Sequence, residues 1–232
     1  MHLLNAQPGA IADGSEAVDL GQSPGRVVFL SAADTELSAI AQARAKMVDD
    51  FLTIRLANLM QLSHNMSVDL YCEQIIAKAE LVIVRLLGGV SYWPYGVEQI
   101  VDTCKRYNVS LALLPGDDQP DDDLMSRSTV APDSCHRFWQ YCVHGGRQNA
   151  QAFLKFAASL VGGTCDWLEP KPLLRAGLYW PGVSMPSLDV IQSGWPADVS
   201  VVPVVFYRAH LQVENLAAID CLIEALEAAE LA

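Results

Sequence analysis

Strand-like and helix-like patterns alternate along the first half of the chain. Nearly continuous apolar runs at residues 27–30, 81–87 and 109–114 are typical of parallel strands buried on both faces, and the β-branched stretch 51–57 predicts another strand. Between them, apolar positions recur with a helical period at residues 34–47, 68–79 and 97–104, with Ser31 or Asp34 and then Ser67 as predicted helix caps. This order predicts an α/β fold with a doubly wound, flavodoxin-like parallel sheet, because parallel neighbours need crossover helices.

The second half of the chain has a different pattern. An acidic loop at residues 117–123 follows the last strand, and two helical patterns at 135–143 and 148–161 are separated by Gly145-Gly146. A stretch rich in Gly, Pro and aromatics then leads to a predicted strand at 199–207 and a helix at 216–231. We therefore divide the chain into an irregular segment 1–25, a parallel α/β domain 26–118, a connecting region 119–196, and the start of a second α/β unit at 197–232.

Composition and charge exclude several classes of protein. The 232 residues are 51% hydrophobic and 18% charged, which excludes a disordered, collagen-like or coiled-coil chain. A formal net charge of −12 would repel a nucleic-acid backbone, so we expect no nucleic-acid partner. The mean hydropathy of +0.21 indicates either a large core or an interface that other protein surface covers.

The termini and cysteines indicate an intracellular setting. Residues 1–9 carry neither a basic nor a continuous apolar region of a secretory signal, and no apolar run approaches the ~20 residues of a membrane-spanning helix. We therefore expect a cytoplasmic protein without a membrane span. Six cysteines without CxxC spacing predict free thiols rather than disulfides.

The turn after residues 81–87 is the main candidate ligand site. Gly88-Gly89 ends this strand at the edge where parallel sheets usually bind ligands, but it lacks both GxGxxG and P-loop spacing. Tyr92, Trp93 and Tyr95 follow, and their rings could form a platform for a planar ligand such as a tetrapyrrole. A tight turn and burial of the rings against a neighbouring domain are the simpler explanations.

Other polar clusters carry weaker signals. The acidic loop 117–123 lacks the spacing of a calcium loop, and it is more typical of a solvated turn. Cys135, His136, Cys142 and His144 match no zinc signature, so we predict no metal ligands in this chain. His210 follows the strand predicted at 199–207, where functional side chains gather, although a structural histidine is the commoner case. Spacing alone assigns no catalytic residue.

Four segments together resemble one known family. They are FLSAADTEL at 29–37, RLLGGVSYWPYG at 85–96, LPGDDQPD at 114–121 and VFYRAH at 205–210. In this order they are similar to the N-terminal region of the large subunit of aerobic cobaltochelatases of the CobN type, which are related to the H subunit of magnesium chelatase. Asp69-Leu-Tyr71 and Gly145-Gly146-x-x-Asn149 fit the same pattern, and the likeness extends from about residue 27 to residue 232.

The resemblance implies ATP-dependent insertion of Co²⁺, as a substrate, into hydrogenobyrinic acid a,c-diamide during aerobic cobalamin synthesis. It further implies three protein partners: the remainder of the large subunit, an AAA+ ATPase subunit that holds ATP and Mg²⁺, and a companion subunit (the CobS and CobT types). No cofactor is expected to bind tightly to this chain itself. Because the family's large subunit is far longer, we expect this chain to be an N-terminal fragment that is inactive alone.

Two roles within such a complex remain open. The chain could be a scaffold that docks other parts of the chelatase, or it could contribute directly to the substrate site, where arginines would pair with corrinoid carboxylates. The candidate substrate-binding residues are Arg85, Gly88, Gly89, Tyr92, Trp93, Tyr95, Arg208 and His210. An unrelated flavodoxin-like module that binds a small ligand or docks another protein, without chelatase activity, is the remaining alternative.

Overall fold

The structure is a computed structural model that describes residues 16–183, 186–196 and 198–232. Its contacts divide the chain into two compact units, Met1–Lys171 and Pro172–Ala232. The acidic loop at 117–123, where we predicted a domain boundary, lies inside the first unit. Residues 1–15 of the predicted irregular segment lie outside the described residues, and residues 16–25 form neither helix nor strand.

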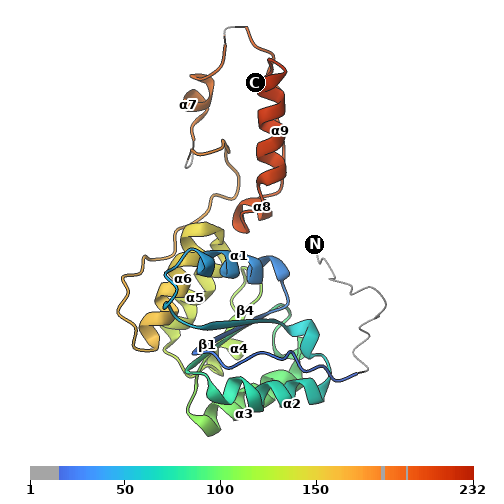
Figure 1. Ribbon diagram of the computed structural model, residues 1–232, viewed down its shortest axis with the longest axis vertical. Coiled ribbons are helices and arrows are strands. Elements are labelled where there is room, and N and C mark those ends of the chain that lie inside the picture. The colour runs from blue at the N-terminus through green and yellow to red at the C-terminus, as the bar shows by residue number, and fades with distance from the viewer. Residues whose placement is uncertain (1–15, 184–185, 197) are drawn as a thin grey trace. The chain divides into compact units, whose positions relative to one another are not determined.

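A four-stranded parallel sheet with the order β2-β1-β3-β4 forms the centre of the first unit (Figure 1). Its strands are β1 (Val27–Ser31), β2 (Ile54–Asn58), β3 (Leu81–Leu86) and β4 (Ser110–Pro115). In register, Val27 pairs with Ile54 and Leu81, and Leu81 pairs with Ser110. β1 and β3 are buried along their whole length, as their continuous apolar sequences predict.

Helices cover both faces of this sheet, which confirms the doubly wound α/β fold. The elements of the first unit after β1 are α1 (Asp34–Ala45), η1 (Leu59–Leu62), α2 (Asn65–Gln74), η2 (Ile76–Lys78), η3 (Val90–Tyr92), α3 (Pro94–Tyr107), α4 (Asp122–Ser126), α5 (Pro132–His144) and α6 (Gly146–Leu160). The core against α2 and α3 contains Val28 and Leu30 of β1, whereas the core against α1, α5 and α6 contains Val27 and Phe29. Alternate residues of one strand therefore seal two separate cores.

Both predicted helix caps are wrong. Helix α1 has Ala33, and neither Ser31 nor Asp34, at its N-cap position, with no side-chain cap hydrogen bond. Helix α2 begins at Asn65, and the His64 side chain caps it by accepting from the Met66 amide. Ser67, the predicted cap, is buried, and its Oγ accepts a hydrogen bond from the Val18 amide at 2.7 Å. Ser67 therefore anchors the N-terminal segment to α2 instead of starting the helix.

The second unit contains short helices and extended chain. Its elements are α7 (Leu188–Gln192), α8 (Ala209–Gln212) and α9 (Ala217–Ala228). The strand predicted at residues 199–207 is wrong for this structure: among the described residues the segment joins no sheet, and its pairing there is an isolated parallel bridge between Ser200 and Leu231. Apolar, β-branched sequence favours a strand, but a strand also needs a hydrogen-bonded neighbour.

Candidate functional site

The carboxyl ends of β1 and β3 form the candidate site. These strands are neighbours in the sheet, and the chain leaves them toward opposite faces, through α1 after β1 and through α3 after β3. Such a switch in winding direction is where open α/β sheets bind ligands. Gly88, Gly89 and the three aromatics singled out from the sequence all follow β3 at this edge.

A buried ion pair connects the strand ends. Arg85 at the end of β3 is 5% exposed, and its guanidinium pairs with the carboxylate of Glu36 on α1. Arg85 Nε donates to the Pro115 carbonyl at 3.0 Å, and Ser31 Oγ donates to Glu36 Oε2 at 2.7 Å. One network thus joins β1, β3, β4 and α1, and it already supplies partners for the arginine that we expected to bind a ligand carboxylate.

A second polar pair lies at the end of β2. Asn58 Nδ2 donates to Asp34 Oδ1 at 2.6 Å, and Asn58 Oδ1 accepts from the Met60 amide at 2.9 Å. Sequence reasoning treated Asp34 only as a helix cap and did not single out Asn58 or Glu36. The signal that could have identified Asn58 is its polar side chain directly after a predicted strand that ends at this edge.

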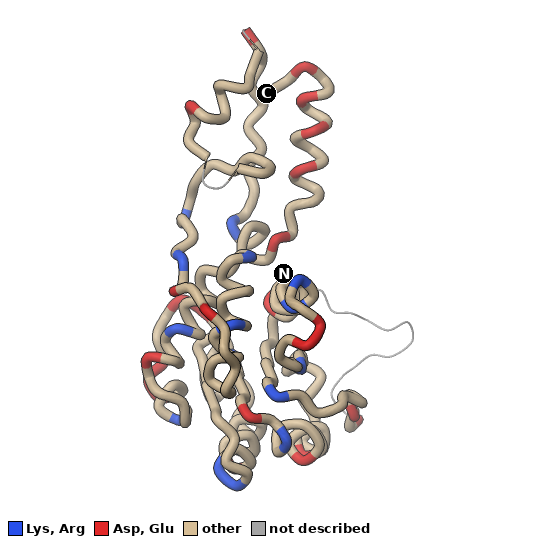
Figure 2. Tube along the Cα trace, turned by 60° about the vertical axis from the view of Figure 1, so that its left-hand side comes forward, with Lys and Arg blue, Asp and Glu red and all other residues tan. Residues whose placement is uncertain are grey.

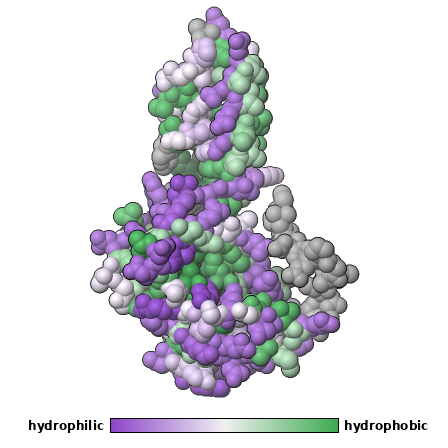
Figure 3. All heavy atoms as spheres, in the orientation of Figure 1, coloured by the Kyte–Doolittle hydropathy of each residue, from purple (hydrophilic) through white to green (hydrophobic). Residues whose placement is uncertain are grey.

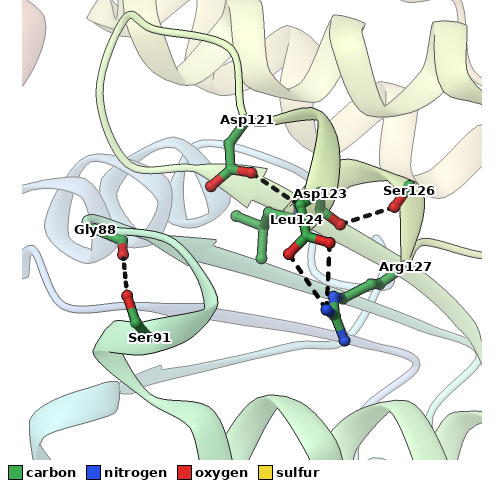
Figure 4. Close-up of polar contacts among 7 residues, drawn as sticks. All are labelled: Gly88, Ser91, Asp121, Asp123, Leu124, Ser126 and Arg127. Carbon is green, nitrogen blue, oxygen red and sulfur yellow. Dashed lines mark hydrogen bonds and ion pairs between the residues drawn. The ribbon is translucent and has the colours of Figure 1, made fainter.

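The Gly88-Gly89 turn lies against the acidic loop. Both residues have positive φ, +87° and +68°, which side chains other than glycine rarely adopt. A Cβ on Gly89 would lie 2.7 Å from Asp121 Oδ2, and Ser91 Oγ donates back to the Gly88 carbonyl at 3.2 Å (Figure 4). Because the Asp121 carboxylate adjoins the turn, this edge favours a neutral or cationic group over an anion.

The acidic loop itself is partly used for local structure. Asp121 Oδ1 accepts from the Leu124 amide at 2.9 Å and so caps α4, and Asp123 pairs with Arg127 one turn later (Figure 4). These contacts agree with the structural interpretation of the loop that the sequence favoured.

The three aromatics have different surroundings. Trp93 is 9% exposed and donates from Nε1 to the Leu62 carbonyl at 3.1 Å, so its indole belongs to the core. Tyr95 donates to Asp69 Oδ1 at 2.7 Å, a hydrogen bond that raises the pKa of the phenol. Tyr92 is 47% exposed, and its hydroxyl lies 3.3 Å from the sulfur of Met60. Of the predicted platform, the ring of Tyr92 is the one that solvent reaches most.

Two further exposed apolar side chains follow strands that end at the same sheet edge. Met60 is 53% exposed after β2, and Leu87 is 50% exposed after β3. We call Met60, Leu87 and Tyr92 the edge patch. Apolar side chains of this size at the ends of strands suit contact with an apolar ring or with another protein surface.

The remaining predicted site residues, Arg208 and His210, lie in the second unit. Arg208 donates from Nη2 to the Leu173 carbonyl at 3.3 Å, and among the described residues its buried Nε has no hydrogen-bond partner. His210 Nδ1 lies 3.2 Å from the Asn215 carbonyl oxygen, and its ring lies 6.3 Å from that of Phe206. Both therefore contact residues of their own unit.

The cysteines and histidines do not converge. Burial raises the pKa of the Cys135 and Cys142 thiols, and the charge of Arg85 partly opposes this effect at Cys142. His136 packs edge-on against Trp139, and His144 Nε2 lies 3.1 Å from Gln140 Oε1. Within residues 16–183, 186–196 and 198–232, no three His, Cys, Asp or Glu side chains are grouped so that they could hold a metal ion. The same residues include no helix that is both long and apolar enough to cross a bilayer.

Comparison with known proteins gives consistent matches. A family model described as CobN/Magnesium Chelatase matches residues 139–232. The chain is 45% identical over 236 residues to the aerobic cobaltochelatase subunit CobN of a Sinorhizobium species, and 39% identical over 229 residues to that of Pseudomonas aeruginosa. Each match covers 98% of this chain but 18% of the relative, so the chain spans less than a fifth of their length.

A solved structure matches in fold. The catalytic subunit of cobaltochelatase from Mycobacterium tuberculosis aligns with a TM-score of 0.65 at 24% identity, over 89% of this chain and 15% of that one. At this identity the likeness shows the fold alone.

Proposed function

We propose that this chain belongs to the CobN/magnesium chelatase family and is the N-terminal region of the large, tetrapyrrole-binding subunit of an ATP-dependent cobaltochelatase. The observation that carries this proposal is the 45% identity to a CobN subunit over 98% of the chain. The complex would act in the cytoplasm on hydrogenobyrinic acid a,c-diamide and Co²⁺. An AAA+ ATPase subunit would bind ATP and Mg²⁺, with its companion subunit alongside (the CobS and CobT types).

Within that complex, we assign this chain a scaffold role. Insertion of Co²⁺ releases two protons from ring nitrogens, and it therefore needs a base and metal ligands next to the ring. At the carboxyl edge of this sheet, Arg85 and Glu36 neutralise each other, and Trp93 is held in the core by Leu62. These groups fix the strand ends and helices, which suits a part that positions other regions of the large subunit.

A chimera tests the proposed function. This chain would replace its matching region in the Sinorhizobium relative, and Co²⁺ insertion into hydrogenobyrinic acid a,c-diamide would be measured with ATP and the relative's two smaller subunits. We expect the chimera to insert cobalt. We expect a titration of the isolated chain with the corrinoid to show no saturable binding. A folded chimera that assembles but inserts no cobalt would contradict the proposal.

Direct contact with the ring is a second candidate role, and the exposed ring of Tyr92 beside Met60 favours it. If the edge patch contacts the corrinoid, Tyr92→Ala in the chimera should raise the KM for the corrinoid about 3- to 10-fold with kcat unchanged, because an aromatic contact contributes about 0.5–1.5 kcal/mol. Steady-state kinetics with Tyr107→Ala as the control measures this, since Tyr107 is 53% exposed at the far end of α3. Equal KM values for both variants would exclude the contact and leave the scaffold role.

A further inference from the structure

The second unit has almost no core of its own. Among its described residues, Ile191 and Ile219 are the buried apolar side chains, and they are still 8% and 9% exposed. Figure 3 shows hydrophobic residues at the surface of this unit. Its large exposed apolar residues include Leu174, Leu178, Leu188, Val190, Val201, Val205, Tyr207 and Leu222. A segment of about this size cannot offset its conformational entropy without more apolar burial.

The exposure is concentrated in residues 199–207, which we call the valine-rich segment. Val205 is 93% exposed, Tyr207 is 83% and Val201 is 53%. In an extended chain, alternate residues share a face, so these three belong to one bare face. The opposite face is partly covered, because the ring of Phe206 lies 5.7 Å from that of Tyr179. A strand of a parallel sheet would have both faces covered.

The backbone of this segment has begun a parallel ladder. The Ala232 amide donates to the Ser200 carbonyl at 3.0 Å, and the Val202 amide donates to the Ala232 carbonyl at 2.5 Å. Helix α9 lies between the two paired stretches, which is the connection that parallel strands require. Among the described residues, no hydrogen bond is recorded for the amides of Val204 and Phe206, which come next on the same edge of the segment.

Pro203 is compatible with this geometry. Successive residues of a strand direct their amides to opposite edges, so Pro203 belongs to the edge that faces away from Leu231. A proline is tolerated in a strand when the missing N–H is on the unpaired side. Pairing can therefore continue through Val204 and Phe206 on the side where it has started.

Helix α9, between the two paired stretches, has polar and apolar sides. Its carboxylates Asp220, Glu224 and Glu227 recur with helical spacing, and Figure 2 shows acidic positions along the helix, whereas Ile219 on it is buried. The unit carries seven acidic residues and two basic ones, Arg175 and Arg208. Glu224 and Glu227 are exposed, whereas Asp220 accepts a hydrogen bond from the Tyr179 hydroxyl at 2.6 Å. A crossover helix on a parallel sheet likewise has a polar side in solvent and an apolar side toward the sheet.

We propose that the valine-rich segment is a β-strand of a second parallel sheet, and that its partner is the part of the large subunit outside the region that this chain matches. This rests on the proposed function, and the more than four-fifths of each relative that lies outside the match is the source of the partner. The partner contributes a strand that hydrogen-bonds to Val204 and Phe206 and an apolar layer that covers Val201, Val205 and Tyr207.

Hydrogen–deuterium exchange on the isolated chain and on the chimera tests the proposal. At a concentration at which the isolated chain is monomeric, the amides of Val204 and Phe206 should exchange rapidly. In the chimera they should exchange at least about tenfold more slowly, because ladder hydrogen bonds must open first. Slow exchange in the monomeric isolated chain, or equally fast exchange in a folded chimera, would overturn the pairing.

Substitutions on the bare face provide the second measurement. Val205→Asp should leave the isolated chain's thermal midpoint unchanged but lower the yield of folded chimera and remove the protection of Val204 and Phe206, whereas Val205→Thr should retain both. Val48→Asp is the matched control, since Val48 is 67% exposed in the first unit. An insoluble wild-type chimera, or no effect of Val205→Asp on a folded one, counts against the proposal.

Two further outcomes separate the possible partners and functions. A dimer of the isolated chain that Val205→Asp abolishes would show that the segment pairs with a second copy, which overturns the partner proposed here. A chimera that protects Val204 and Phe206 but inserts no cobalt would contradict the proposed function and support the pairing. A chimera that inserts cobalt but leaves the amides of Val204 and Phe206 unprotected would support the proposed function and contradict the pairing.

Discussion

At the scale of single residues, Arg85 shows why a charged side chain at a ligand edge need not bind a ligand. The residue is 5% exposed, the Glu36 carboxylate balances its charge, and the Pro115 carbonyl accepts from its Nε. The sequence places Arg85 at a strand end but cannot show that Glu36, 49 residues earlier, reaches it from α1. The partner of a buried charge depends on packing between residues far apart in the sequence. The pairing of Arg85 with Glu36 was therefore not predictable from the sequence.

We expect Arg85→Met to lower the free energy of unfolding by about 3–5 kcal/mol, because it leaves the Glu36 carboxylate without its cation in a mostly buried position. Urea denaturation measures the change. Arg127→Met is the control: Arg127 is in an exposed pair with Asp123, and its loss should cost less than about 1 kcal/mol. Equal costs for the two variants would show that the buried network contributes no special stability.

At the scale of elements, predictability followed the length and continuity of the apolar pattern. The runs at 81–87 and 109–114 correspond nearly residue for residue to β3 and β4. A nearly continuous apolar run of this length is typical of a parallel strand that is buried on both faces. The orientation of Trp93 was not predictable, since it depends on how α3 packs. Gly96 on α3 lies directly against the indole, so the absence of a side chain there lets Trp93 enter the core.

Gly96→Ala should therefore destabilise the first unit by about 1–3 kcal/mol, although alanine is the better helix former, because its methyl group would overlap the ring of Trp93. Thermal unfolding and the tryptophan emission maximum measure the effect, which should include a red shift as the indole gains exposure. Asp102→Ala, on the exposed side of α3, should leave both unchanged or slightly raise stability. A stabilised Gly96→Ala variant would contradict the packing described here.

At the scale of the whole chain, the two units differ in what their sequences can bury. Nearly all buried apolar side chains belong to Met1–Lys171, where both faces of the sheet are sealed. The same apolar strand pattern occurs at 199–207, yet it forms no strand, because pattern alone supplies neither the neighbour nor the covering layer that a parallel strand needs. The sequence pattern thus predicts which segments can form a strand. Whether a strand forms depends on the neighbouring strand and the covering layer that are available.

This difference predicts separate folding behaviour. A chain of residues 1–171 should show a cooperative urea transition, whereas residues 172–232 alone should show circular dichroism of largely unfolded chain and no cooperative transition, because their apolar burial is too small. Circular dichroism of the two pieces measures this, and matched molar concentrations exclude an effect of association. A cooperative transition in residues 172–232 would mean that the second unit completes its own core, and it would remove the physical reason for a partner strand at Val204 and Phe206.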